Sequence, residues 1–300
     1  MPTLKEIKAR IGSVQSTLKI TSAMKLVSSA KLRKAQHAIE AMRPYEQALQ
    51  QMLAAVSPDV SPQSAPTGEE TVSGKTVIVA MASNSSLCGG FNANVIAQVS
   101  RVRRAGDTVI SIGRKMADAM RRDGFPSPED YTALADHPAY APAARLVECL
   151  SEERAAGHID RVLLVYNHYV SAAKQVPVVE TLLSPRAVPQ EASDSPDSPD
   201  SPAAPAQKDE TPLEDAPDII LEPGREALLD ALAPKTLKLK LFAALLDSAA
   251  AEHAARTVAM QTASDNAENL LAELTLQYNK GRQQKITSEI LDLAGGQIEA

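Results

Sequence analysis

One short stretch of the sequence combines residue types that phosphate-binding loops and cysteine enzymes use. Residues 83–92 read SNSSLCGGFN; they follow the apolar run VIVAMA and precede a helix-like segment. Many phosphate-binding loops begin with a strand, a paired-glycine turn and a helix start, because a helix N-terminus attracts anions. The turn also holds Cys88, a thiol that could act as a nucleophile. The stretch therefore raises the hypothesis of an active site.

The details of this stretch favour a structural turn over a nucleotide site. A dinucleotide loop requires GxGxxG and a Walker loop ends in GK[ST], whereas Gly89 and Gly90 stand alone. Cys88 has no local base, although His168 could approach it through the fold. We therefore predict that the two glycines permit a close strand-to-helix approach and that Cys88 is a small, packed thiol.

The remaining residues form no catalytic or metal-binding pattern in the sequence. The five histidines never pair at metal-ligand spacing, and HExxH, GxSxG and clustered carboxylates do not occur. His253 falls on an apolar helical stripe, which predicts a packed or snorkelling imidazole. We predict that the chain carries no catalytic residue, no cofactor and no metal.

Composition and charge indicate a large helical part and segregated charge. Only 3% of the 300 residues are aromatic, which suits long packed helices better than a thick globular core. Two cysteines, the lack of an apolar leader and short apolar runs predict a soluble protein of a reducing compartment. The net charge is −6, but residues 1–53 hold nine Lys and Arg against three Glu. The acidic excess lies in residues 184–222, with ten acidic and two basic residues.

Both ends of the sequence show the apolar spacing of coiled-coil helices. In residues 1–56 a 3-4 spacing begins at Leu4, and in residues 223–300 a longer one runs from Leu229 to Tyr278. A helix of the first length spans about 80 Å, which no compact small domain needs. We therefore predict that the two helices pair as an antiparallel coiled coil. In the N-terminal helix we expect the stripe to shift phase at three residues: Ile20, Met24 and Val27.

The C-terminal helix has three further features. Its middle places small residues on the stripe, so the seam should be thin and weak alone. Pro234 indicates either a kink or a fresh helix start. Polar side chains crowd its end, which fits either a solvated terminus or a tip that projects beyond the partner helix into another protein. These residues are Gln277, Asn279, Lys280, Arg282, Gln283, Gln284, Lys285 and Thr287.

Residues 75–183 alternate between strand-like and helix-like segments. Nearly all-apolar strands that alternate with helices predict a parallel or mixed sheet covered on both faces, a Rossmann-like domain. Residues 184–222 hold eight prolines and little apolar surface, so we predict a disordered acidic insert. The expected fold is thus α/β plus a long antiparallel coiled coil, in four segments: 1–56, 75–183, 184–222 and 223–300.

Three motifs occur in order along the chain: KEIKARIGSVQSTLKITSAMKLV, SSLCGGFN and EHAARTVAMQTASDNAENLLAELTLQYNKGRQQKITSEI. With them the chain resembles, over nearly its whole length, the gamma subunit family of F-type ATP synthases. Family members usually carry Asp-Arg-Gly where this chain has Asn84-Ser85-Ser86, and Gly-Ala where Gly296 precedes Gln297. The acidic insert is not a general family feature.

The resemblance implies a non-catalytic rotor shaft. In that family the terminal helices lie inside a hexamer of alpha and beta subunits, and the beta subunits hold the catalytic sites. The α/β domain and the lower coiled coil sit on the ring of membrane c subunits, beside epsilon. The expected location is peripheral, at the cytoplasmic face of the inner (plasma) membrane, with no direct membrane span and no nucleic acid as partner.

The resemblance also assigns partner-binding residues by position. Two residues match the segment that faces the acidic lever of the beta subunit, and four match the polar catch between the shaft tip and its sleeve. We expect these residues to bind the alpha/beta hexamer and to take no part in chemistry. They are Met24 and Lys25, and then Arg282, Gln283, Thr287 and Glu289.

Two other classes of protein remain open at this point. One is an α/β nucleotide-binding enzyme with helical arms for dimerisation, which would bind nucleotide tightly as an isolated chain. The other is a free-standing coiled-coil scaffold that binds nucleic acid through its basic N-terminal arm, with salt-sensitive affinity. The thin seam argues against the scaffold, because such a helix pair needs a surrounding sleeve.

Overall fold

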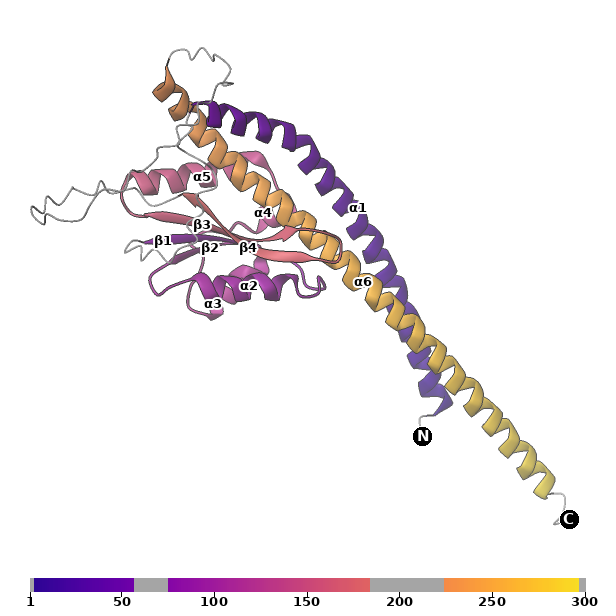
Figure 1. The fold of residues 1–300 in the computed structure, drawn as a ribbon. Coiled ribbons are helices and arrows are strands. Elements are labelled where there is room, and N and C mark those ends of the chain that lie inside the picture. The colour runs from indigo at the N-terminus through magenta and orange to yellow at the C-terminus, as the bar shows by residue number, and fades with distance from the viewer. Residues whose placement is uncertain (1–2, 57–74, 184–223, 297–300) are drawn as a thin grey trace, which may run out of the picture.

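A computed structural model describes residues 3–56, 75–183 and 224–296. Two long helices, α1 (Leu4–Val56) and α6 (Arg225–Gly296), run side by side in opposite directions, so both chain ends lie at the same end of the molecule (Figure 1). The predictions for residues 57–74 and 184–222 lie outside the described residues. The division of the chain into four segments stays a prediction.

Two contacts fix the register of the helix pair. The Ser264 hydroxyl donates to Thr21 Oγ1 at 2.8 Å. Further along, a Cβ built on Gly281 would lie 3.1 Å from Leu4 Cδ2. Both helices advance by 17 residues between these contacts, so the antiparallel register holds without a shift. The predicted antiparallel coiled coil is confirmed.

The predicted phase shift in the N-terminal helix is wrong. Thr21, Ser28 and Ala35 are buried, and they continue the 3-4 spacing that begins at Leu4. Two of the three residues assigned to a new phase face outward instead: Ile20 and Val27 are 60% and 58% exposed. The third, Met24, is half-buried at the edge of the seam. Small polar residues keep the seam in phase here, and a search for apolar residues alone passes over them.

The N-terminal part of α6 excludes one of the two alternatives that were open for Pro234. The helix begins at Arg225 and continues through Pro234, so a fresh start at the proline is wrong. Leu232 and Leu239 on either side of it are buried against Leu49 of α1. This packing offsets the hydrogen bond that proline removes from a helix interior.

The domain between the helices is built on a four-stranded sheet in the order β2-β1-β3-β4. The central strand β1 runs parallel to both β2 and β3, whereas β4 pairs antiparallel with β3. The predicted mixed, Rossmann-like sheet is therefore confirmed. The strands are β1 (Thr76–Met81), β2 (Thr108–Ile112), β3 (Arg161–Tyr169) and β4 (Gln175–Leu183).

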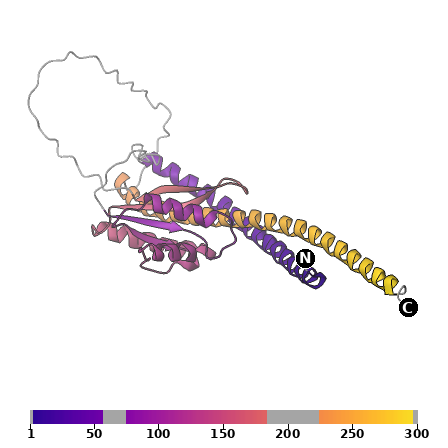
Figure 2. The same ribbon diagram turned by 90° about the horizontal axis from the view of Figure 1, so that it is seen from below.

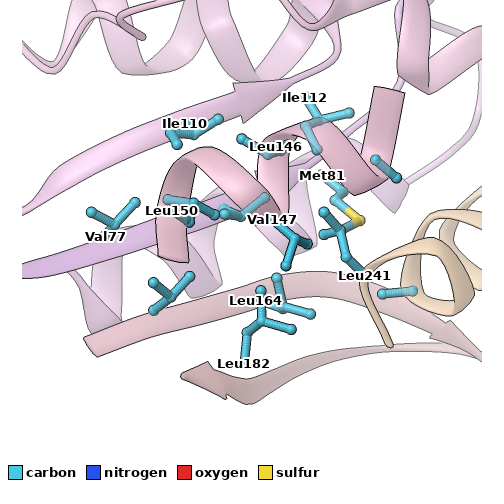
Figure 3. Close-up of a cluster of buried hydrophobic side chains, with 14 of the residues drawn as sticks. Val77, Met81, Ile110, Ile112, Leu146, Val147, Leu150, Leu164, Leu182 and Leu241 are labelled. Carbon is cyan, nitrogen blue, oxygen red and sulfur yellow. The ribbon is translucent and has the colours of Figure 1, made fainter. Parts of the chain in front are cut away.

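Helices cover both faces of this sheet (Figure 1). Helices α2 (Phe91–Val102) and α3 (Arg114–Arg122) pack on one face. On the other face α5 (Tyr140–Ala155) and α6 pack against the sheet, and the short helix α4 (Thr132–Asp136) lies nearby. The sequence did not predict α4, because five residues are too few for a periodic signal. Figure 3 shows Leu146, Val147 and Leu150 of α5 and Leu241 of α6 meeting the strand residues Val77, Met81 and Leu164.

Helix α6 is buried on most of its circumference where it passes the sheet. Leu241, Ala244 and Leu245 face the domain, while Leu246 and Ala250 belong to the predicted seam with α1. A helix buried on all sides has no amphipathic stripe, which is why its second contact face was not predicted. Beyond the domain the two helices continue together as a bare rod (Figures 1 and 2).

Candidate partner-binding surface

The last part of α6 projects beyond the helix that accompanies it. Gly281 contacts Leu4 at the start of α1, and every residue from 282 to 291 is exposed. Fifteen residues from Gly281 to Gly296 correspond to about 22 Å of unaccompanied helix. Four predicted partner-binding residues lie on this tip: Arg282, Gln283, Thr287 and Glu289.

Contacts among the described residues of the tip are local and weak. Glu289 pairs with Lys285 at 3.7 Å, with both side chains about two-thirds exposed. The Thr287 hydroxyl donates back to the Gln283 carbonyl at 2.9 Å. Exposed ion pairs of this kind contribute little to stability. The tip side chains are therefore accessible to a partner at small energetic cost.

Met24 and Lys25 lie at a second position along the rod. Both are half-buried at the edge of the seam between α1 and α6. The register places them level with Met260, about 30 Å along the helix axis from Arg282. The structure therefore does not gather the six predicted residues into one site. They form two separate contact regions on the rod, here named stations: Met24 and Lys25 on α1, and the four tip residues on α6.

Apolar side chains accompany both stations, and they were missed or misassigned in the sequence. Ile20, Leu26 and Val27 are exposed on the outer face of α1, with Leu26 70% exposed. On the tip, Ile290 and Leu291 are 59% and 65% exposed, and Leu276, just before the tip, is 72% exposed. Exposed apolar side chains that gather in a patch are typical of surfaces that contact other proteins. The 3-4 spacings of α1 and α6 share one register, and this register fixes which residues of α1 point toward α6. Reading the two spacings together could have identified the outer face of α1 from the sequence.

The turn at residues 83–90 is anchored by two buried side chains, Ser83 and Cys88, while Ser85, Ser86 and Leu87 between them are exposed. Cys88 is 1% exposed, and its sulfur accepts a hydrogen bond from the Asn92 amide at 3.1 Å. Among the described residues its hydrogen-bond partners are Ser83, Ser85 and Asn92, and His168 is not one of them. Gly89 adopts a φ of +58°, a left-handed conformation that glycine tolerates best. The predicted burial of Cys88 is confirmed.

His253 is packed beside the seam, one of the two environments predicted for it. Its Nδ1 is buried and has no hydrogen-bond partner among the described residues. Burial, together with the nearby charges of Arg256 and Lys31, lowers the pKa of His253 to about 4. The imidazole is therefore neutral at physiological pH.

Among the described residues, no three His, Cys, Asp or Glu side chains gather closely enough to hold a metal ion. Within residues 3–56, 75–183 and 224–296, no helix is both long and apolar enough to span a membrane.

The fold and these exposed stations define a stalk protein: a long helical rod with a lateral α/β domain and contact surfaces along its length. Comparison with known families assigns the class more narrowly. Residues 3–298 match the family model described as ATP synthase. The chain is 44% identical to the ATP synthase gamma chain of Bacteroides thetaiotaomicron, and the match covers 100% of both chains. The gamma chain of Phocaeicola vulgatus is also 44% identical, over 99% of this chain and 100% of its own.

The chain therefore belongs to the ATP synthase gamma chain family, the rotor stalk of F-type ATP synthases. Solved structures share the fold. A rotor chain of Euglena gracilis mitochondrial ATP synthase matches 94% of this chain with a TM-score of 0.64 at 20% identity. A second Euglena gracilis chain, from an assembly of OSCP, F1 and c-ring, matches 98% with a TM-score of 0.67.

Family membership bears on the classes that the sequence left open. The relatives are named as gamma chains of ATP synthases, each one chain of a larger complex. This favours a subunit of such a complex over a free-standing scaffold or a solitary nucleotide-binding enzyme.

Proposed function

We propose that this chain transmits torque between a membrane ring of c subunits and a catalytic hexamer of alpha and beta subunits, and catalyses no reaction itself. The observation that carries the proposal is the shape of the shaft. Two helices locked in one register pass the α/β domain and end in a single exposed helix. A rotor needs length and stiffness, and this arrangement supplies both.

The two stations on the rod are the proposed contacts with the hexamer. Met24 and Lys25 face the acidic lever of a beta subunit, where a basic helix is attracted over roughly a Debye length of about 8 Å. The tip binds the sleeve through its polar catch. This catch consists of Arg282, Gln283, Thr287 and Glu289.

The opposite end of the molecule is the proposed base. The α/β domain and the adjacent ends of α1 and α6 contact the c-ring and the epsilon subunit. The chain is held peripherally at the cytoplasmic face of the inner (plasma) membrane and has no nucleic acid partner. The domain lies on one side of the rod only (Figure 1), which supports an asymmetric rotor.

Asymmetry is what allows one shaft to act on three similar beta subunits. At each orientation the shaft presents a different face to each of them. A conformational equilibrium shifts only as far as the contact energies with its two states differ. The exposed apolar face of α1, on the side away from α6, supplies such a difference.

A charge substitution at Met24 tests this proposal. Met24→Lys adds a cation beside the acidic lever, so it should reduce proton pumping per ATP hydrolysed more than it reduces assembly. The measurement is ATP-driven acidification of vesicles that contain the complex, set against the rate of ATP hydrolysis. Ala41→Lys is the control, because it adds the same charge to an exposed position of α1 about 25 Å away. Unchanged pumping per ATP in Met24→Lys would count against the assigned contact.

A further inference from the structure

Helix α6 presents one stripe of residues to the ends of the strands. Asp247, Ala251, Ala255 and Ala259 are spaced four apart, so they lie on one face of the helix. Ala251 and Ala255 are buried in one cluster with Cys88 and Phe91, from the turn after β1 and the start of α2. A Cβ built on Gly89 would lie 4.0 Å from the Ala259 Cβ. The small side chains let the turn approach α6 closely.

A polar anchor closes one end of this stripe. The Asp247 carboxylate pairs with His168 Nδ1 at 2.5 Å and accepts the Tyr169 backbone N–H at 3.1 Å. The Tyr169 hydroxyl in turn accepts a hydrogen bond from Gln36 of α1 at 3.1 Å. The end of β3 is thus tied to both helices of the shaft.

A buried ion pair lies near the other end. Arg256 Nη1 donates to Glu252 Oε1 at 2.5 Å, and the two side chains are 9% and 7% exposed. Its other terminal nitrogen, Nη2, lies 3.4 Å from the Ser85 carbonyl oxygen and within 3.5 Å of the Ser85 hydroxyl. Neighbouring Asn84 holds this turn to the rest of the domain: its amide donates to the Thr132 carbonyl at 2.8 Å.

We propose that this joint between the strand ends and α6 carries torque between the α/β domain and the shaft, with Arg256 and Asp247 as its positioning residues. Hydrophobic contact is non-directional, so the alanine stripe alone resists separation but not sliding. Hydrogen bonds and ion pairs have preferred geometry, and they are strongest when a partner is charged. Two sets of contacts cross the joint, Arg256 to Ser85 and Asp247 to His168 and Tyr169, and these resist slip of the domain along or around α6. Glu252 lies on α6 itself and only orients the Arg256 guanidinium. This inference rests on the proposed rotor function.

Loss of the Arg256 anchor should cause slip under load. Arg256→Met alone leaves the Glu252 carboxylate buried without a partner, which is strongly destabilising. The double variant Glu252→Gln with Arg256→Met removes that charge as well and should fold and assemble normally. We expect this double variant to hydrolyse ATP at the normal rate without load. Hydrolysis should, however, no longer slow as the proton gradient builds up, so stimulation by an uncoupler should be lost.

The experiment uses the whole membrane complex in sealed vesicles and measures hydrolysis with and without uncoupler. Asp118→Asn with Arg121→Met is the matched control, because it removes an exposed ion pair of α3 in the same way. It should keep full uncoupler stimulation. A folded, assembled Glu252→Gln/Arg256→Met complex with normal stimulation would overturn the joint while leaving the rotor function intact.

A second variant covers the case in which that double variant fails to assemble. Asp247→Asn keeps an acceptor for the Tyr169 N–H but removes the charge opposite His168, so partial loss of uncoupler stimulation is expected. Normal stimulation here would also contradict the joint. Failure of the unmodified chain to assemble with alpha and beta subunits would instead contradict the proposed function itself.

Discussion

At the scale of residues, the seam of the shaft uses hydroxyl groups where most coiled coils use large apolar side chains. Thr21 and Ser264 are buried and hydrogen-bonded to each other, and the Thr21 hydroxyl donates to the Leu18 carbonyl at 3.1 Å. A buried polar pair contributes little net stability, but a shift in register would break the bond between the helices and take the Thr21 acceptor away from the buried Ser264 hydroxyl. The seam is therefore thin and specific. That combination suits a rod which must stay narrow inside a sleeve.

The neutral, packed state of His253 predicts that acid weakens the fold. The pKa of His253 is about 4 in the folded chain and near 6.5 when the chain is unfolded. The unfolded state then binds more protons between these values, so stability is full above pH 6.5 and falls as the pH drops toward 4. Between pH 7 and pH 5 the loss should be about 1–2 kcal/mol.

Urea unfolding of the full chain at these two pH values measures this loss. His253→Gln is the comparison, because it keeps a polar side chain of similar length that does not titrate. The pH-dependent difference between the wild type and His253→Gln should have the stated sign and size. Equal pH dependence of the two chains would show that His253 is protonated as readily in the fold as in the unfolded chain.

At the scale of elements, the sequence predicted the helices and the sheet because each has its own periodicity. The 3-4 spacing predicted both long helices and their pairing, and apolar runs predicted four strands. What it could not supply were the contacts between elements. The second face of α6, with Leu241 and Ala244, carries no separate signal, because the helix is buried on most of its circumference where it passes the sheet.

For the candidate site, too, the sequence predicted what a residue pattern can show and missed what contacts between elements decide. The types of the tip residues fitted either a solvated terminus or a tip that projects into another protein, and the exposure of Arg282 and Thr287 beyond the start of α1 agrees with both. The roles of these residues came from family resemblance, and they stay predictions. The outer apolar face at Ile20 and Val27 was misassigned, because a seam built from Thr21 and Ser28 is invisible to apolar periodicity.

Substitution of Val27 tests the corrected seam. If Val27 faces outward, Val27→Ala should change the free energy of unfolding of the full chain by less than about 0.5 kcal/mol. Leu49→Ala is the positive control; Leu49 is 5% exposed in the cluster with Leu232 and Leu239, so about 2–5 kcal/mol should be lost. Urea unfolding measures both. A loss at Val27 comparable to the loss at Leu49 would restore the predicted phase shift.

At the scale of the whole molecule, length and asymmetry are the properties that the family's function requires. The joined helices keep one register from Thr21–Ser264 to Leu4–Gly281, and α6 then continues alone for about 22 Å. The domain emerges from one side of the rod and is fastened to α6 at the ends of its strands (Figure 1). A body of this shape transmits rotation from one end to the other and presents a different face in each direction.

Direct observation of rotation tests the central proposal, and the chain offers a convenient handle. Cys149 on α5 is exposed and Cys88 is buried, so a bead can be attached through Cys149 alone. Burial and the nearby Glu129 and Glu153 carboxylates raise the pKa of Cys149, so the labelling reaction should need a mildly alkaline buffer.

The measurement is single-molecule tracking of that bead on surface-fixed complexes of this chain with alpha and beta subunits, after ATP is added. The account predicts stepwise rotation in one direction that stops when ATP is removed. ATP hydrolysis by the assembled complex with a stationary bead, or with undirected motion, would contradict the proposal that this chain is a torque-transmitting shaft.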